Sequence, residues 1–311
     1  MLRQIAEDRQ SFTHRQRVVK SYIIFNPIAG SVSDRDAILS QLSQLKPVKL
    51  RLTRKSGDAE KWAREALKMK SDLVVVVGGD GTLNEVVNAL ANRARNVRIG
   101  IVPMGTGNDF ARTLGLPSSV EENIDLLKSA TKTTRVDVVR VKSMRTRYFV
   151  NVSAGGFSGL VDKKITPKIK RTWGPLTYVR GAAAALPHLH AYRTRLVLND
   201  DERVAVELYN VVIANGRFVA GGLPIAPAAD PSDGLIDVVL IPKLSGPELA
   251  LLAAEILLGK HLSSNAITFR QVRKIAVRSR PGMWFNVDGE LIGNAPAVFQ
   301  ILPRALNFIV R

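Results

Sequence analysis

The segment with the clearest chemical potential runs Gly78-Gly79-Asp80-Gly81-Thr82-Leu83-Asn84-Glu85, directly after the apolar run 73–77. The apolar run predicts a buried strand and the pattern over 82–91 predicts a helix, so the glycines occupy a strand-to-helix turn. Glycine lets the backbone approach a ligand closely, and the free N–H groups of a helix start favour phosphate. Because an aspartate would repel phosphate unless a cation lay between them, Asp80 is expected to contact Mg²⁺; the alternative is a tight turn with Asp80 as a simple cap.

Two more polar, glycine-containing segments follow predicted strands. Asn26-Pro27-Ile28-Ala29-Gly30 comes after the strand 22–25, and Gly105-Thr106-Gly107-Asn108-Asp109 comes shortly after the strand 99–102. Because the carboxyl ends of parallel strands lie at one edge of a sheet, we expect the three loops to converge there around a ligand. The chain lacks a Walker-type phosphate loop and the glycine pattern of a dinucleotide oxidoreductase, which argues against both of those classes.

Two acidic turns later in the chain could add a base and a metal site. Asp288-Gly289-Glu290 is typical of a hairpin turn, and alternation would put Asp288 and Glu290 on the same side if the strand continued. One could then accept a proton, although phosphoryl transfer depends mainly on positioning and charge neutralisation. Ser232-Asp233-Gly234-Leu235 offers oxygen donors suited to Mg²⁺ or Ca²⁺, with an ordinary Asp-Gly turn as the alternative.

The elements that must position these residues alternate regularly up to about residue 134. Short runs rich in β-branched residues are separated by helical patterns, which is typical of parallel strands covered on both faces. We therefore predict a doubly wound, mostly parallel α/β sheet. The predicted strands are 22–25, 48–52, 73–77 and 99–102, and the predicted helices are 34–45, 58–69 and 82–91.

Beyond residue 134 the pattern changes to closely spaced strands and turn signals, which favours an all-β antiparallel sandwich with inserted helices over 173–186 and 246–258. The predicted strands are 135–141, 148–152, 195–198, 203–213, 235–241, 274–278, 284–287, 297–302 and 306–310. The predicted organisation is a basic arm (1–17), a nucleotide-binding α/β domain (18–134), a β-sandwich substrate domain (135–296) and C-terminal strands (297–311) that could return to the first domain.

The composition of the chain limits the classes of partner and the cellular compartment that we expect. The 311 residues include 45 Lys and Arg against 27 Asp and Glu, a formal charge of +18 at pH 7, which implies an anionic partner such as a membrane face, nucleic acid or a phosphorylated ligand. The chain has no cysteine, which excludes disulfides, thiolate nucleophiles and Cys-ligated zinc. It shows neither a secretory signal nor an apolar run that could span a bilayer, so we expect a cytoplasmic protein, peripheral at a membrane surface.

The ordered set of motifs resembles the diacylglycerol kinase catalytic-domain family, which includes sphingosine kinases and bacterial soluble lipid kinases. The resemblance covers nearly everything from residue 21 onward. Gly-Gly-Asp-Gly-Thr alone is shared with NAD kinases and 6-phosphofructokinases, whereas the full set is more specific. The matching segments are residues 26–30, 53 with 57–59, 78–82, 105–111, 154–157, 174–178, 232–234 and 287–290.

The resemblance implies ATP and Mg²⁺ as cofactors, with ATP bound between the two domains. Glu290 matches the family's proton acceptor, with Asp288 as the rival candidate, and Asp80 is expected to organise Mg²⁺. A metal site is implied at Asp230 and Leu235 through their backbone carbonyls and at Asp233 through its carboxylate. The implied nucleotide contacts are Asn26, Pro27, Ile28, Ala29, Gly30, Thr53, Gly78, Gly79, Asp80, Gly81, Thr82, Leu83, Asn84 and Thr106.

Together these observations predict an ATP-dependent kinase that moves the γ-phosphoryl group to a hydroxyl of diacylglycerol or a similar lipid at an anionic membrane surface. The segment 162–186, where basic residues precede Trp173 and Tyr178, is the candidate for lipid access; the alternative is a solvated loop followed by a core helix. A second hypothesis is an NAD kinase, which the loops at Asn26 and Thr106 oppose. A third is a non-catalytic nucleotide- or nucleic-acid-binding protein. Because no base-stacking aromatic strand is evident, no nucleic acid is expected; a homo-oligomer is left open.

Overall fold

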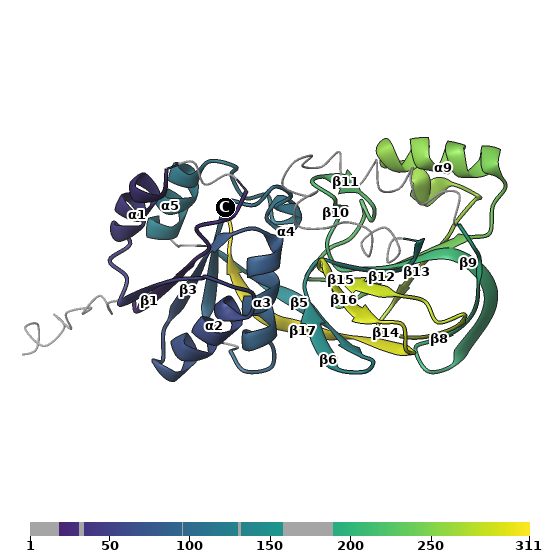
Figure 1. Cartoon of the computed structure of the whole chain (residues 1–311), viewed down its shortest axis with the longest axis horizontal. Coiled ribbons are helices and arrows are strands. Elements are labelled where there is room, and N and C mark those ends of the chain that lie inside the picture. Colours follow the sequence, from purple (N-terminus) through teal and green to yellow (C-terminus); the bar gives the residue numbers. More distant parts are fainter. Residues whose placement is uncertain (1–18, 31–33, 95, 130–131, 158–188) are drawn as a thin grey trace, which may run out of the picture.

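The structure is a computed structural model that describes residues 19–30, 34–94, 96–129, 132–157 and 189–311. Figure 1 shows an α/β half built around β1 and β3 beside a second half made of antiparallel strands. The predicted fold class is therefore confirmed: a mostly parallel, doubly wound sheet is followed by an antiparallel β-sandwich region that carries a helix. Within the described residues, no helix is both long and apolar enough to cross a membrane.

Four parallel strands form the sheet of the α/β half. They are β1 (Ser21–Phe25), β2 (Lys49–Leu52), β3 (Leu73–Gly78) and β4 (Arg98–Pro103). Their spatial order is β2-β1-β3-β4, so the winding switches sides between β1 and β3. Open α/β sheets bind ligands at the carboxyl ends of the strands where this switch occurs. The first two glycine-containing loops follow these two strands.

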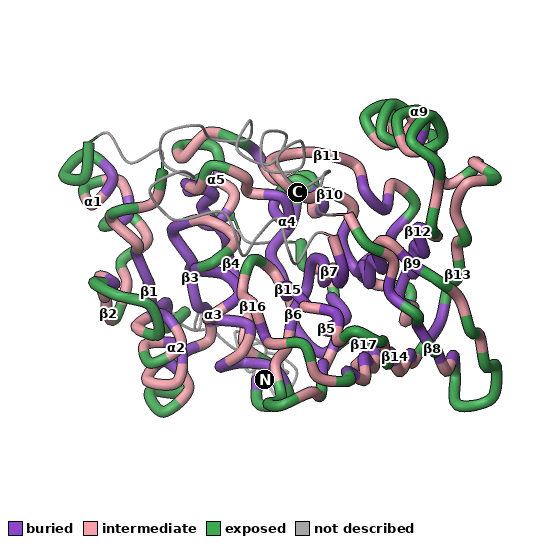
Figure 2. Tube along the Cα trace, turned by 45° about the vertical axis from the view of Figure 1, so that its right-hand side comes forward, coloured by how far each residue is buried: buried purple, intermediate pink, exposed green. Residues whose placement is uncertain are grey.

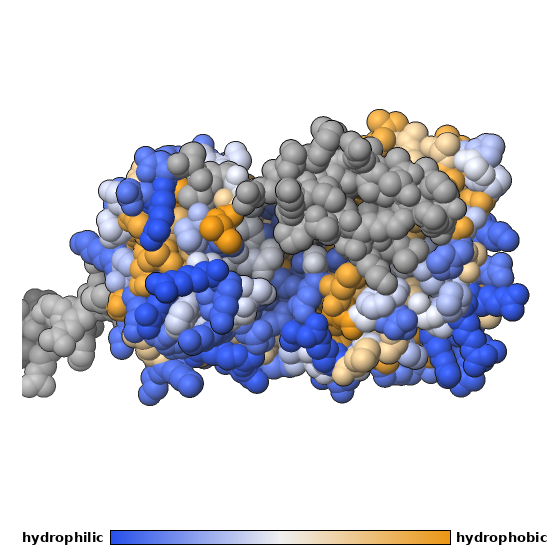
Figure 3. All heavy atoms as spheres, in the orientation of Figure 1, coloured by the Kyte–Doolittle hydropathy of each residue, from blue (hydrophilic) through white to orange (hydrophobic). Residues whose placement is uncertain are grey.

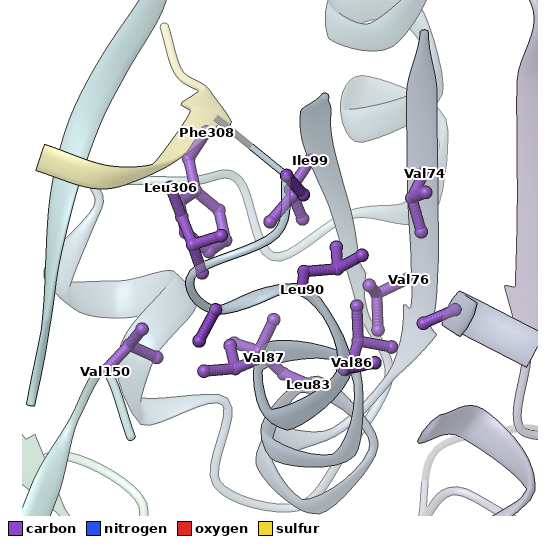
Figure 4. Packing of buried hydrophobic residues seen from close by; sticks show 14 of the residues in the cluster. Val74, Val76, Leu83, Val86, Val87, Leu90, Ile99, Val150, Leu306 and Phe308 are labelled. Atoms are coloured by element: carbon purple, nitrogen blue, oxygen red, sulfur yellow. The ribbon is translucent and has the colours of Figure 1, made fainter. Parts of the chain in front are cut away.

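Helices cover both faces of this sheet. α2 (Asp58–Lys68) and α3 (Asp80–Leu90) pack on one face, while α1 (Arg35–Ser43) and α5 (Val120–Ser129) pack on the other. Successive valines of β3 alternate between the two cores: Val74 and Val76 lie with α3, as Figure 4 shows, and Val75 and Val77 lie in the opposite cluster. Burial on both faces explains why β3 is an uninterrupted valine run.

The second half is built from mostly antiparallel strands around two apolar clusters, and Figure 2 shows their buried positions. Its strands are β5 (Thr133–Lys142), β6 (Thr146–Phe149), β7 (Val152–Gly156), β8 (Tyr192–Leu198), β9 (Glu202–Ala214), β12 (Ile236–Pro242), β13 (Thr268–Val272), β14 (Lys274–Arg280), β15 (Phe285–Val287), β16 (Glu290–Gly293) and β17 (Ala297–Ile309). A short hairpin, β10 (Phe218–Val219) with β11 (Leu223–Pro224), and the helices α4 (Asp109–Thr113), α9 (Gly246–Leu257) and η2 (His261–Ser263) complete the described elements.

The last strand joins the two halves. β17 pairs antiparallel with β14 and β5, and its end pairs parallel with β4 through Asn307 and Phe308. The prediction of two separate strands, 297–302 and 306–310, is wrong, because β17 is continuous with an irregularity between Leu302 and Leu306. Arg304 lies there at φ 51°, and its backbone N–H donates to the carboxylate of Asp137 on the neighbouring strand β5, so a side chain replaces the interrupted ladder.

The predicted strand 148–152 is also wrong, since the chain divides it between β6 and β7. The backbone N–H groups of Val150 and Asn151 donate to the carboxylate of Asp288 instead of to a neighbouring strand. The side-chain Nδ2 of Asn215 donates a hydrogen bond to the carbonyl of Val150. Distant side chains therefore satisfy this backbone, which a local apolar pattern cannot reveal. The predicted basic arm (1–17), the predicted helix 173–186 and the candidate lipid-access segment 162–186 lie outside the described residues.

Candidate functional site

The loops that follow β1, β3 and β4 lie in direct contact. The side-chain Nδ2 of Asn26 donates to Oγ1 of Thr82 across 3.0 Å. A methyl group on Gly79 would lie 2.8 Å from the Cα of Gly105, a separation that two carbon atoms cannot tolerate. The structure thus brings together the segments 26–30, 78–84 and 105–109, and glycine is required where the second meets the third.

The first and third loops also touch. A Cβ on Gly30 would lie 2.5 Å from Oγ1 of Thr106, so the side chain of Thr106 lies against the backbone of the first loop. Ile28 projects outward and is 78% exposed, whereas Leu83 is buried in the apolar core. Of the side chains predicted to contact nucleotide, that of Leu83 therefore faces away, and only its backbone could take part.

Asp80 joins two helices. It is the first residue of α3, two residues before the predicted helix start. Its Oδ2 accepts the backbone N–H of Asp109 at 3.1 Å and its Oδ1 accepts that of Phe110 at 3.2 Å, so it caps α4 rather than its own helix. Each carboxylate oxygen keeps a further lone pair, which leaves the predicted role toward Mg²⁺ chemically feasible.

Asp109 is a buried carboxylate that was absent from the predicted site residues. Both of its oxygens accept the backbone N–H of Gly221, in the turn between β10 and β11, at 3.1 Å. Burial, and then the negative charge of Asp80, raise the pKa of Asp109 to about 6, against the effect of the Gly221 hydrogen bonds. Its place in the Gly105–Asp109 motif was the available signal, since a motif position with an acidic side chain is a candidate ligand.

Asp288 is the most strongly perturbed acid among the described residues. It lies with Gly289 in the two-residue turn between β15 and β16, where both have positive φ (43° and 88°), as a type I′ hairpin requires. Its carboxylate accepts backbone N–H groups of Val150, Asn151 and Val152 at 3.2, 3.4 and 2.8 Å. Burial raises the pKa of Asp288 to about 7, and the charge of Asp80 adds to the rise.

Glu290 has a different environment. It begins β16, after the turn, so it does not continue one strand with Asp288 and the two carboxylates are not related by strand alternation. Its Oε1 pairs with Nη2 of Arg145 at 2.8 Å and of Arg147 at 3.3 Å, and its side chain is 40% exposed.

Helix α3 connects the loops to this hairpin. The buried side chain of Asn84 donates through Nδ2 to the carbonyl of Val287 at 3.5 Å, directly before Asp288. On the opposite side, the carboxylate of Glu85 accepts the backbone N–H groups of Gly57 and Ala59 at 2.9 and 3.0 Å. One helix therefore holds the hairpin turn on one side and the start of α2 on the other.

The remaining predicted nucleotide residue, Thr53, directly follows β2 at the same sheet edge. Its backbone N–H donates to the carbonyl of Phe25 at 2.9 Å, and its side chain is buried. Because β2 lies beside β1 in parallel, Thr53 lies at the carboxyl edge with the first loop.

The predicted metal residues form two local turns. Oδ1 of Asp230 accepts from the backbone and the hydroxyl of Ser232, and Oδ1 of Asp233 accepts from the backbone N–H of Leu235 at 2.8 Å. Their charges, after burial itself, raise the pKa of the neighbouring acids Asp137 and Asp237. No group of three or more acidic or histidine side chains in the described part of the chain could hold a metal ion, so the metal site stays a prediction that relies on two backbone carbonyls and the Asp233 carboxylate.

Comparison with known proteins points in one direction. The family model of the diacylglycerol kinase catalytic domain matches residues 20–141, and that of the YegS C-terminal NAD kinase beta sandwich-like domain matches residues 150–310. A diacylglycerol kinase of Staphylococcus epidermidis is 32% identical over 292 residues, covering 93% of this chain and 91% of that protein. A diacylglycerol kinase of Staphylococcus saprophyticus is also 32% identical, over 93% of this chain and 94% of its own.

Solved structures agree on the fold. A proposed diacylglycerol kinase from Bacillus anthracis str. Sterne superposes with a TM-score of 0.78 at 25% identity, over 94% of this chain and 95% of that one. An NAD kinase from Archaeoglobus fulgidus in complex with ATP superposes with a TM-score of 0.55 at 15% identity, over 93% of each chain. The second likeness concerns the fold alone.

Proposed function

The chain belongs to the diacylglycerol kinase catalytic-domain family, and from this premise we propose that it transfers the γ-phosphoryl group of ATP to a hydroxyl of diacylglycerol or a similar lipid. The observation that carries the proposal is the contact between three glycine-containing loops at one sheet edge, beside Asp80, with Asp288 of the β-sandwich region within electrostatic reach. Parallel-strand edges with exposed helix starts bind phosphate, and adjacent carboxylates suit a metal-assisted transfer.

In this reaction the lipid hydroxyl oxygen forms a bond to the γ-phosphorus, and the bond from phosphorus to the β–γ bridging oxygen breaks with its electron pair leaving on ADP. The start of α3 and the glycine backbone would hold the phosphates. Bound Mg²⁺ would neutralise charge on the phosphates. The carboxylate oxygens of Asp80 and Asp109, which both lie within 3.3 Å of the point a Cβ on Gly107 would occupy, are the hard donors that it prefers.

The hydroxyl proton requires an acceptor, and the contacts favour Asp288 over Glu290. The pKa of Asp288, raised to about 7 by burial, lies near the working pH expected of a general base, while Glu290 is engaged by Arg145 and Arg147. Asp288 also belongs to the hairpin that α3 contacts through Asn84, so it is tied to the helix that begins with Asp80. We therefore assign proton acceptance to Asp288.

The proposal is tested by incubating the purified full chain with γ-³²P-labelled ATP, Mg²⁺ and a detergent-dispersed total lipid extract, in parallel with soluble NAD. We expect label in an organic-phase lipid that comigrates with a phosphomonoester lipid, and none in the NAD reaction. The high net charge of +18 supports presentation of this lipid at an anionic membrane surface. Label in NADP, or no transfer to any lipid while ATP still binds, would contradict the assignment.

A further inference from the structure

A basic groove lies at the end of the β-sandwich region, and none of its lining residues belongs to the candidate kinase site. The groove has a volume of about 540 Å³ and is lined by parts of β8, β9 and β14 together with the turn that leads into α9. Its charged lining residues are Arg193, Lys243 and Arg280 against a single carboxylate, Glu207. Figure 1 shows these strands at the end of the molecule that is remote from α1 and α2.

The register of β8 against β14 concentrates positive charge beside this groove. Arg193 lies directly opposite Arg280, and Arg195 lies directly opposite Arg278, in an antiparallel pair. All four side chains are exposed. Like charges placed opposite each other on one sheet face repel and destabilise the pairing, so two successive Arg–Arg pairs carry a cost that a bound anion would remove.

Carboxylates of the chain neutralise only part of the positive charge in this groove. On the other side of β8, Glu207 lies opposite Arg193 and approaches its Nε at 3.4 Å, with Arg193 still 85% exposed. Across the described residues, Lys243 and Arg280 have no carboxylate partner. An exposed, loosely made ion pair contributes little, so the groove keeps an excess of positive charge.

The backbone that carries these cations is fixed. The N–H of Lys243 donates to the carbonyl of Glu207 at 3.0 Å, and the hydroxyl of Tyr209 donates to the carbonyl of Leu244 at 3.3 Å. Arg193 and Arg280 lie on hydrogen-bonded strands. Because this backbone is already fixed, only side-chain freedom is lost when an anion binds, which lowers the entropic cost of binding.

We propose that this groove binds a phosphate group, held by the guanidinium groups of Arg193 and Arg280 and the ammonium group of Lys243. Guanidinium matches phosphate oxygens in a bidentate fashion, and the groove volume is that of sites for small organic ligands rather than for a bare ion. The phosphate could belong to a phospholipid headgroup or to a soluble phosphate ester, two sources of the same chemistry. This inference goes beyond the proposed kinase activity and does not depend on it.

The neighbourhood of α9 makes the lipid source the stronger expectation. α9 begins three residues after Lys243, and it and the residue that follows expose Leu251, Leu257 and Leu258 at 62, 66 and 70%. Figure 3 shows apolar surface where α9 lies in Figure 1. A phosphate-binding groove next to exposed leucines is the arrangement of a surface that rests on a bilayer.

The test measures binding of the full chain without ATP, so failure of the kinase proposal would not affect its outcome. The groove variant is Arg193→Gln/Arg280→Gln, and the matched control, Arg270→Gln/Arg273→Gln, removes two exposed arginines of the same region outside the groove. The probes are phosphatidylcholine vesicles with and without phosphatidic acid, and soluble glycerol 3-phosphate measured by calorimetry. Thermal melting of each variant verifies folding.

We expect the groove variant to bind phosphatidic acid vesicles about tenfold or more weakly than the control variant, because each arginine near an anionic surface contributes to binding. A third variant, Glu207→Gln, removes the competing carboxylate and should tighten binding. A defect confined to vesicles identifies the lipid headgroup, and a matching defect with glycerol 3-phosphate identifies a soluble ester; both support the site. Equal losses in the groove and control variants, or unchanged binding in the groove variant, would overturn it.

Discussion

The carboxylate of Asp80, at the start of α3, accepts the backbone N–H of Asp109, at the start of α4, across 3.1 Å. Asp109 in turn accepts the N–H of Gly221 from the β10–β11 turn. A chain of carboxylate-to-backbone bonds therefore runs from the glycine-rich loop of the α/β half to a hairpin of the β-sandwich region. Any ligand that changes the charge around Asp80 acts on a link between the two halves.

Replacing Asp80 by Asn should lower turnover at least about tenfold and raise the Mg²⁺ concentration that gives half-maximal rate, because a neutral amide is a poorer magnesium ligand than a carboxylate. The amide oxygen can still accept one of the two α4 N–H groups, so the melting temperature should change little. Steady-state assays over a Mg²⁺ series, with a thermal melt, provide the measurement. A near-normal rate and Mg²⁺ dependence would remove Asp80 from the reaction.

The roles of Asp288 and Glu290 separate in a paired comparison. Asp288→Asn should reduce kcat by about a hundredfold or more, since removal of a general base costs on the order of 10²–10⁴. Glu290→Gln should lose less than about tenfold, because it breaks exposed pairs with Arg145 and Arg147 while Asp288 remains. If instead the glutamine variant is the slower of the two, Glu290 is the proton acceptor.

Asp288 also makes stability depend on pH in a defined direction. Burial raises its pKa from 3.8 to about 7, so the folded protein holds this proton more tightly than the unfolded chain. The contribution of Asp288 to the free energy of unfolding is therefore largest at low pH. It decreases as the pH rises from about 4 through about 7, where the folded protein must ionise a buried acid.

Asp288→Asn removes that penalty, so its melting temperature relative to the parent should be higher at pH 8 than at pH 5. Thermal melts of both proteins at the two pH values give the answer. The Asp109→Asn variant should show the same trend over a lower range, because its pKa is raised only to about 6. A melting difference that is independent of pH, or larger at pH 5, would show that Asp288 is ionised in the folded protein at both values.

The contact between the second and third loops can be tested with one methyl group. In Gly79→Ala the added carbon would lie 2.8 Å from the Cα of Gly105, so backbone must move, at a cost of about 1–3 kcal/mol. We expect a lower melting temperature and at least about tenfold weaker binding of ATP. Gly81→Ala adds the same methyl where nothing lies within 4 Å, and its melting temperature should match the parent's. Equal melting of the two variants would mean that the loops are not packed as described.

Local patterns in the sequence predicted much of the fold. The valine run of β3 and the strand-to-helix alternation predicted a parallel sheet, and that sheet forms. The meeting of the three loops followed from strand direction alone, because parallel strands end at one edge. The hairpin at Asp288 and Gly289 was likewise readable from turn chemistry, since both residue types tolerate positive φ.

The environments of Asp288 and Glu290 could not be predicted from local sequence patterns. Asp288 receives the N–H of Val150 across 138 positions of sequence, and Glu290 meets Arg145 across 145. Asp288 thus accepts backbone N–H groups while burial raises its pKa, and Glu290 is paired with arginine, although the two acids lie two residues apart. The same long-range bond interrupts the predicted strand 148–152.

The amino-acid sequence by itself thus predicted the fold class of each half and the resemblance to the family, because periodicity, glycine spacing and turn chemistry act over a few neighbouring residues. Tertiary structure alone decided which carboxylates are buried, which are paired with arginine, and that Asp80 binds the backbone of α4. It also decided that four arginines of β8 and β14 face one another in register. Burial and charge pairing depend on groups brought together from distant parts of the chain, and only the folded arrangement specifies those neighbours.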